Sequence, residues 1–169
     1  MDHPAVRYSF VLVTYIVLQY AIFSQFRIDR VSIDLLLVLA IAAGMQSGIV
    51  LGAIVGFACG LSLDLMTITP FGLGAISYLA AGAVGGALEQ ATVHAARWLT
   101  ATVSLLSTVS ALVLFAVLGS ILGRNDLLTG HLAVVIAVVG ITNALLIFPT
   151  LRFCRWVDPE ESRIRTASR

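Results

Sequence analysis

Charged residues are scarce in this chain, and lysine is absent from it altogether. Charged side chains make up 11% of the 169 residues, whereas a soluble domain usually contains about 25%. Hydrophobic residues account for 59%, and the mean hydropathy is +1.01. Because a spanning helix needs about 20 apolar residues, this length allows about six spans and leaves no room for a soluble domain. The sequence therefore predicts a single integral membrane domain.

Cysteine and histidine are also rare, and their spacing is not typical of a metal site. Cys59 and Cys154 fall in different apolar segments, so we expect them at different depths, as small apolar side chains without a disulfide. The three histidines, His3, His94 and His131, stand at expected helix ends and are interpreted as interfacial polar residues. No strand is predicted, which excludes a phosphate-binding loop between strand and helix. No catalytic, metal-binding, cofactor-binding or nucleic-acid-binding residues are indicated.

Six apolar segments are separated by short polar or turn-forming stretches, which predicts an all-α polytopic membrane protein. The expected spans cover residues 5–26, 31–46, 48–65, 71–88, 98–122 and 131–151, and a basic tail covers residues 152–169. The second and third spans form a tight hairpin with Gly44 and Gly48 at its hinge. Pro70 and two glycines predict a turn before the fourth span, and Pro149 is expected near the end of the sixth.

Glycine recurs at every fourth residue from Gly44 to Gly60, and the next step of four falls on Asp64. Each glycine in a helix costs about 1 kcal/mol relative to alanine. In a bilayer, however, small residues four apart let two helices approach backbone to backbone. We therefore expect a packing interface, inside the bundle in preference to a partner's helix. The predicted helix-packing residues are Gly44, Gly48, Gly52, Gly56, Gly60, Gly82 and Gly86.

Two aspartates, Asp34 and Asp64, lie at the expected ends of the second and third spans and at similar depth. A carboxylate at membrane depth is costly and suggests a function. A structural role is the alternative for both residues. Asp34 is suited to cap its helix, where its charge meets the positive end of the helix dipole. Asp64 stands at the unfavourable end of its helix, so it needs another partner, either Arg27, Arg30 or loop amides.

The distribution of arginine orients the bundle. With six spans both termini share one side, and that side holds seven of the ten arginines. The opposite side holds three: Arg27, Arg30 and Arg124. Because cytoplasmic loops carry an excess of basic residues, we expect both termini in the cytoplasm. The arginines of the tail are interpreted as a topology anchor that contacts anionic lipid.

Three sequence blocks stand close together between residues 33 and 75. They read Ile33-Asp-Leu-Leu-Leu-Val, Gly52-Ala-Ile-Val-Gly-Phe-Ala-Cys-Gly-Leu-Ser-Leu-Asp-Leu and Phe71-Gly-Leu-Gly-Ala. This arrangement resembles the rod-shape-determining protein MreD family, whose pattern is approximately Pro-Asp-Leu-Leu-Leu, Gly-x-x-x-Gly-Phe-x-x-Gly-Leu-x-x-Asp and a Leu-Gly turn. The resemblance covers about a third of the chain, and Ile33 replaces the usual proline. It implies motif roles for Asp34, Gly52, Gly56, Phe57, Gly60, Asp64 and Gly72.

The resemblance implies a non-enzymatic inner-membrane component of the bacterial cell-elongation machinery. Such proteins bind the bitopic protein MreC and, with it, support the glycosyltransferase RodA and its penicillin-binding transpeptidase. Those enzymes insert peptidoglycan along the side wall under guidance from MreB filaments. The family also resembles in fold the six-helix substrate-binding subunits of energy-coupling-factor vitamin transporters. Contacts with membrane lipid and between copies of the chain are compatible with this role.

A vitamin-binding transport subunit is therefore the alternative function. Such subunits usually carry an Ala-x-x-x-Ala motif on their first helix, for docking to the energising partner. The first apolar segment here reads SFVLVTYIVLQYAIF and has no such pair. A vitamin site would also need several polar or aromatic groups that converge among the outer loops, and the expected loops are short. These features favour the cell-shape interpretation.

Overall fold

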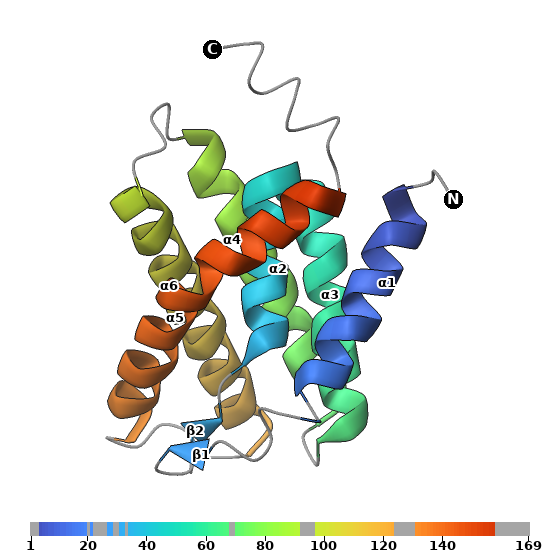
Figure 1. The fold of residues 1–169 in the computed structure, drawn as a ribbon. Coiled ribbons are helices and arrows are strands. Elements are labelled where there is room, and N and C mark those ends of the chain that lie inside the picture. Colours follow the sequence, from blue (N-terminus) through green and yellow to red (C-terminus); the bar gives the residue numbers. More distant parts are fainter. Residues whose placement is uncertain are drawn as a thin grey trace.

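The computed structural model describes residues 4–19, 21, 27–28, 31–32, 34–67, 70–91, 97–123 and 131–157. These residues form an up-and-down bundle of helices (Figure 1). The helices are α1 (Pro4–Leu18), α2 (Leu35–Ser47), α3 (Ile49–Met66), α4 (Leu73–Ala91), α5 (Arg97–Ile121) and α6 (His131–Val157). The beginning of α1 and the end of α6 lie at the same end of the bundle (Figure 1).

A short hairpin joins α1 to α2 and was not predicted from the sequence. β1 (Arg27–Ile28) and β2 (Val31–Ser32) pair antiparallel, with Arg27 opposite Ser32. Two-residue strands are too short to give a period-two pattern, which explains why the sequence predicted no strand. The fold is otherwise helical throughout the described residues.

Three of the described helices are long and apolar enough to cross a membrane: Ile49–Met66, Trp98–Ile121 and Val134–Cys154. The apolar helices Leu35–Ser47 and Leu73–Glu89 are shorter. At 1.5 Å per residue, the 13 residues of α2 reach about 20 Å, less than the hydrocarbon thickness of about 30 Å.

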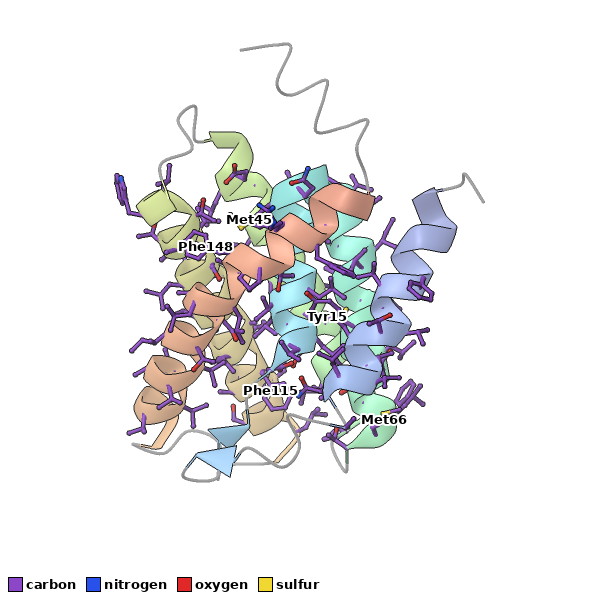
Figure 2. All side chains as sticks on the ribbon, viewed as in Figure 1. Tyr15, Met45, Met66, Phe115 and Phe148 are labelled. Carbon is purple, nitrogen blue, oxygen red and sulfur yellow. The ribbon has the colours of Figure 1, made fainter. Side chains whose placement is uncertain are left out.

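The short helix α2 is the centre of the molecule. All its residues from Leu35 to Gln46 are buried, and it contacts each of the other five helices. It lies in the middle of the bundle in Figure 1. Because neighbouring helices cover it all round, its apolar side chains need no amphipathic pattern. The hydrophobic core is thus built around α2, and the other helices expose their remaining apolar side chains on the outside (Figure 2).

Several helix bounds differ from the predicted spans. The second span was expected from residue 31, but α2 begins at Leu35, because Val31 and Ser32 belong to β2 and Asp34 caps the helix. The fourth span was expected to end at residue 88, and α4 continues to Ala91.

The first span was expected over residues 5–26. α1 covers Pro4–Leu18, Gln19 and Ala21 continue in a π-helical conformation, and residues 22–26 lie outside the described part of the chain. The side chain of Gln19 accepts a hydrogen bond from the amide of Leu35 at 2.8 Å.

The sixth helix continues through Pro149 to Val157 and bends in its second half (Figure 1). Proline removes one ladder hydrogen bond, but burial of the residues after it keeps this part helical. Those buried residues are Thr150, Leu151 and Cys154.

Candidate functional site at the interface of α2, α3 and α4

The glycines of α3 lie directly against the backbone of α4. A Cβ atom added at Gly52 would stand 2.5 Å from the carbonyl oxygen of Gly82, and one added at Gly60 would stand 2.6 Å from the Cα of Ala75. At Gly56 the added atom would collide with the carbonyl group of Tyr78. Real Cβ atoms essentially never approach closer than 3.0 Å. The two helices are therefore in backbone contact that only glycine allows.

The α3 glycines four residues apart, called the glycine ladder below, face glycines of α4 with the same spacing, and the two helices run antiparallel. Gly74, Gly82 and Gly86 face the turns of α3 that contain Gly60, Gly52 and the start of the helix. A Cβ at Gly86 would stand 2.6 Å from the amide nitrogen of Ile49. The position that continues this spacing between Gly74 and Gly82 is Tyr78, whose backbone faces α3 while its side chain turns to Asp34.

Helix α2 joins the same interface at Gly44. An added Cβ at Gly44 would collide with the carbonyl oxygen of Gly82 and stand 3.0 Å from the amide nitrogen of Gly86. Gly52 of α3 also faces the Cα of Gly44. Three helices thus meet at Gly44, Gly52 and Gly82, which explains why the glycine spacing runs through the hinge from α2 into α3.

Gly48 forms the hinge between α2 and α3. Its φ of 88° lies in the left-handed region, which favours glycine because a side chain there is strained. Its amide donates to the carbonyl oxygen of Gly44 at 2.8 Å, which ends α2, and α3 begins at the next residue. Because the hinge consists of Gly48 alone, α2 and α3 stay close enough for their glycines to be in contact.

Asp64 connects the end of α3 to the start of α4. Its Oδ1 accepts a hydrogen bond from the amide of Gly74 at 3.0 Å. Its Oδ2 accepts from the amides of Gly72 at 2.9 Å and Ala75 at 3.1 Å. The side chain is 4% exposed. A buried carboxylate that accepts several backbone N–H bonds is well compensated, and its charge meets the positive end of the α4 dipole.

Of the three candidate partners that the sequence offered for Asp64, the loop amides are confirmed. The side chains of Arg27 and Arg30 lie outside the described residues. Gly72, the last motif residue, has a φ of 96°, so its conformation in the turn favours glycine and its amide points at Asp64.

Asp34 is the N-cap of α2 and also binds α4. Its Oδ1 accepts from the amide of Leu37 at 3.2 Å, and its Oδ2 accepts from the hydroxyl of Tyr78. Gln19 satisfies the amide of Leu35 in the same turn. Four amides at the start of a helix lack helical partners, and these side chains supply two of them. The N-terminus of the central helix is thereby tied to α1 and α4.

Phe57 differs from the other motif residues because it faces outward. Its side chain is 44% exposed, and Val50 and Ile54 on the same helix are 74% and 63% exposed. The internal glycine interface therefore does not use the Phe57 side chain. The Phe57 side chain is therefore available for contact with lipid or with another protein.

The polar contacts around these residues join helices to one another and to the turn before α4. Among the described residues, no group of three or more histidine, cysteine or acidic side chains could hold a metal ion. Cys59 and Cys154 are both free thiols and buried. His3 and His94 lie outside the described residues, as does the side chain of His131. What the site can do is fix three helices and the turn between two of them.

Sequence reasoning missed three residues of this site: Gly74, Tyr78 and Gln19. Gly74, Gly82 and Gly86 follow the same four-residue spacing as the glycines of α3. Tyr78 interrupts this spacing, which is why the pattern was not recognised in the sequence. Gln19 fell within the expected first span and carried no signal of a cap.

Comparison of the chain with protein-family models, with curated proteins and with solved structures finds no match. The fold and the site therefore define a class only: a predominantly helical protein, with three described helices long and apolar enough to cross a membrane, organised around a glycine interface.

Proposed function

We propose that this protein is a non-enzymatic, multi-pass component of the bacterial inner membrane that acts in the cell-elongation complex, as members of the MreD family do. In this role it binds MreC and, directly or through MreC, supports RodA and its penicillin-binding transpeptidase. Both termini lie in the cytoplasm. Side-wall peptidoglycan synthesis and rod shape depend on this assembly.

One observation carries the proposal: the second block of the MreD-like pattern binds the third, and the first block is tied to the same helix, α4. Asp34 of the first block binds Tyr78, and Asp64 of the second block binds the amides of Gly72 and Gly74 in the third. Between these contacts, the glycines of the second block lie on α4. Residues that recur together in a pattern are expected to form one unit, and here they form the unit that holds α2, α3 and α4 together.

The outward position of Phe57 supports a role in partner binding. A motif residue whose side chain is not needed for internal packing has another reason to be specified. In a membrane, association with a single-span partner depends on close van der Waals packing. We propose that Phe57, with Val50 and Ile54, belongs to the face that contacts the partner.

Complementation in a rod-shaped bacterium that lacks its own MreD tests this function. The tagged protein is expected to restore rod shape and to co-purify with MreC after mild detergent extraction. Phe57→Ala is expected to insert normally but to recover less MreC. Ile141→Ala is the matched control, because Ile141 is a 62% exposed apolar residue on a different helix, α6.

Failure to restore shape, together with recovery of an ATPase-coupled transport module, would contradict the proposal. That result would identify the chain as the substrate-binding subunit of an energy-coupling-factor vitamin transporter. Equal MreC recovery for Phe57→Ala and Ile141→Ala would exclude the α3 face as the contact but leave the elongation role intact.

A further inference from the structure

Four polar side chains of α5 and α6 are buried in the bundle. Ser104, Ser107, Thr108 and Asn143 are each 0% exposed. The three α5 residues lie on one face of the helix, because positions three and four apart are neighbours. Asn143 lies opposite them, since its Nδ2 donates to the hydroxyl of Thr108 at 3.2 Å. This cluster, called the α5–α6 polar cluster below, is separate from the glycine interface and its aspartates.

Three oxygen atoms of the α5–α6 polar cluster have no hydrogen-bond partner: Ser104 Oγ, Ser107 Oγ and Asn143 Oδ1. A buried polar atom without a partner costs about 1–3 kcal/mol. Each such atom in a native structure therefore needs an explanation.

The two serines depart from the behaviour of other hydroxyls on the same helix. Thr102, Thr108, Ser110 and Ser120 of α5 each donate to a carbonyl three or four residues earlier. This back-bonding is the usual way in which a hydroxyl is satisfied in an apolar helix. Ser104 and Ser107 do not use it, although both residues are fully buried.

The unpartnered atoms complement one another in hydrogen-bond type. The Thr108 hydroxyl donates to the carbonyl of Ser104 at 2.8 Å, so only its lone pair faces Asn143, and the amide NH2 group must point there. Oδ1 of Asn143 is therefore an acceptor without a donor. The serine hydroxyls can donate and accept. An occupant that both donates and accepts would satisfy all three atoms.

The surroundings of Ser107 limit the size of that occupant. A Cβ added at Gly85 of α4 would stand 3.5 Å from Ser107 Oγ and 3.2 Å from the carbonyl oxygen of Ile41. The cluster carries no formal charge, so a cation would lack an anionic ligand. We propose that the α5–α6 polar cluster is a binding site for internal water, which bridges Ser104 and Ser107 to Asn143. Buried waters typically make about three hydrogen bonds to such groups.

Water-edited solid-state NMR of the full chain in lipid bilayers tests this site directly. Magnetisation from water is expected to reach Thr108 and Asn143. The buried methyl of Ala111, the next turn of α5, is the dry control within the same protein. Equal build-up at all three residues, or none at Thr108 and Asn143, would overturn the proposal.

Alanine variants provide a second measurement. The sign of the shift in their unfolding midpoint distinguishes hydroxyls that bind water from hydroxyls that have no partner. Ser104→Ala and Ser107→Ala are each expected to lower the unfolding midpoint by about 2–4 °C, because the water loses a partner. Ser110→Ala, which removes a back-bonded hydroxyl of α5, is the matched control and should shift it much less. Unchanged or raised midpoints for the first two would contradict bridging water.

Two alternatives to bridging water, direct side-chain hydrogen bonds and a bound cation, predict different results. Direct bonds between the side chains would destabilise the alanine variants without a water signal at Thr108 or Asn143. A bound cation would raise the midpoint of the wild-type protein in Na⁺ relative to choline at equal ionic strength. Either result would overturn the water assignment.

Discussion

A single glycine in the ladder is expected to matter more than its small size suggests. Gly56→Ala should destabilise the protein, although alanine favours a helix by about 1 kcal/mol over glycine. The added Cβ meets the backbone carbonyl of Tyr78, which cannot rotate away. Separation of the helices would then weaken packing along the whole interface. The unfolding midpoint in detergent or lipid nanodiscs measures the effect.

Gly140→Ala is the matched control for Gly56→Ala. Gly140 is also a buried helical glycine, but a Cβ there would meet only the Cδ1 atom of Leu105 at 2.6 Å, the end of a flexible side chain. The helix propensity of alanine should therefore leave this variant unchanged or slightly stabilised. If both variants behave alike, backbone contact at Gly56 is not what limits the site.

The two aspartates are expected to respond differently to asparagine. Asp34→Asn should be tolerated, because asparagine is a good N-cap and the Tyr78 hydroxyl can reverse from donor to acceptor. Asp64→Asn should destabilise by about 1–3 kcal/mol, because both oxygens accept from backbone amides and an amide NH2 cannot replace either. Denaturant or thermal unfolding of the two variants measures the difference, and equal effects would contradict it.

At the level of residues, the sequence predicts what is local. The capping role of Asp34 follows from its place just before an apolar helix. Its bond to Tyr78 spans 44 positions of the chain, so no local pattern could reveal it. For Asp64 the dipole argument predicts the need for a partner, but only the geometry of the turn at Gly72 shows that loop amides bind it.

At the scale of the elements, burial explains how α2 can be much shorter than a membrane span. α2 is too short to cross a bilayer, yet it is covered by protein along its length. Its ends are satisfied by side chains and by the hinge, because the first amides and last carbonyls of a helix have no helical partners. Asp34 and Gln19 at one end and Gly48 at the other meet this requirement.

Helix α1 places Val11 in the hydrophobic core, but it makes fewer contacts with the other helices than any of them makes. We expect it to be the least stable helix of the described bundle. Its Tyr15 donates to Thr150 at 3.1 Å, and Gln19 accepts from the amide of Leu35; Figure 2 shows Tyr15 between α1 and the other helices. Gln19→Ala should raise hydrogen exchange in α1 and in the first turn of α2, because the Leu35 amide loses its partner.

Exchange in α3 and α4 should stay unchanged in Gln19→Ala, since their interface does not use Gln19. Thr14→Ala is the matched control: Thr14 is on α1, but its hydroxyl donates only to Phe10 of the same helix. A uniform rise in exchange over all helices would show that α1 unfolds together with the rest.

The predicted helix bounds are good where apolar runs coincide with packing and poor where a polar side chain intervenes. α3 and α5 begin and end within one residue of the ranges expected from hydropathy. The differences fall at the start of α2, where Asp34 caps the helix directly after β2, and beyond Pro149, where burial of the following turn keeps α6 helical. Hydropathy depends only on which residues are apolar, so it cannot predict contacts between elements.

For the whole molecule, the position of the chain ends constrains the topology. The start of α1 and the end of α6 lie at one end of the bundle (Figure 1), so reporters at the two termini must agree. With seven arginines on the predicted terminal side and three on the other, a fluorescent reporter fused after Arg169 should be active in the cytoplasm. Alkaline phosphatase inserted between residues 124 and 130 should be active outside it.

The charge bias predicts how this orientation can be weakened. Replacing Arg163, Arg165 and Arg169 by glutamine leaves four arginines against three. Because orientation follows the arginine excess near the spans, a measurable fraction of this variant should insert in the inverted orientation. Reversed activity of both reporters already in the wild-type chain would refute the assignment. It would also place Asp64 and the turn at Gly72 on the cytoplasmic side, where the proposed elongation partners would meet a different face.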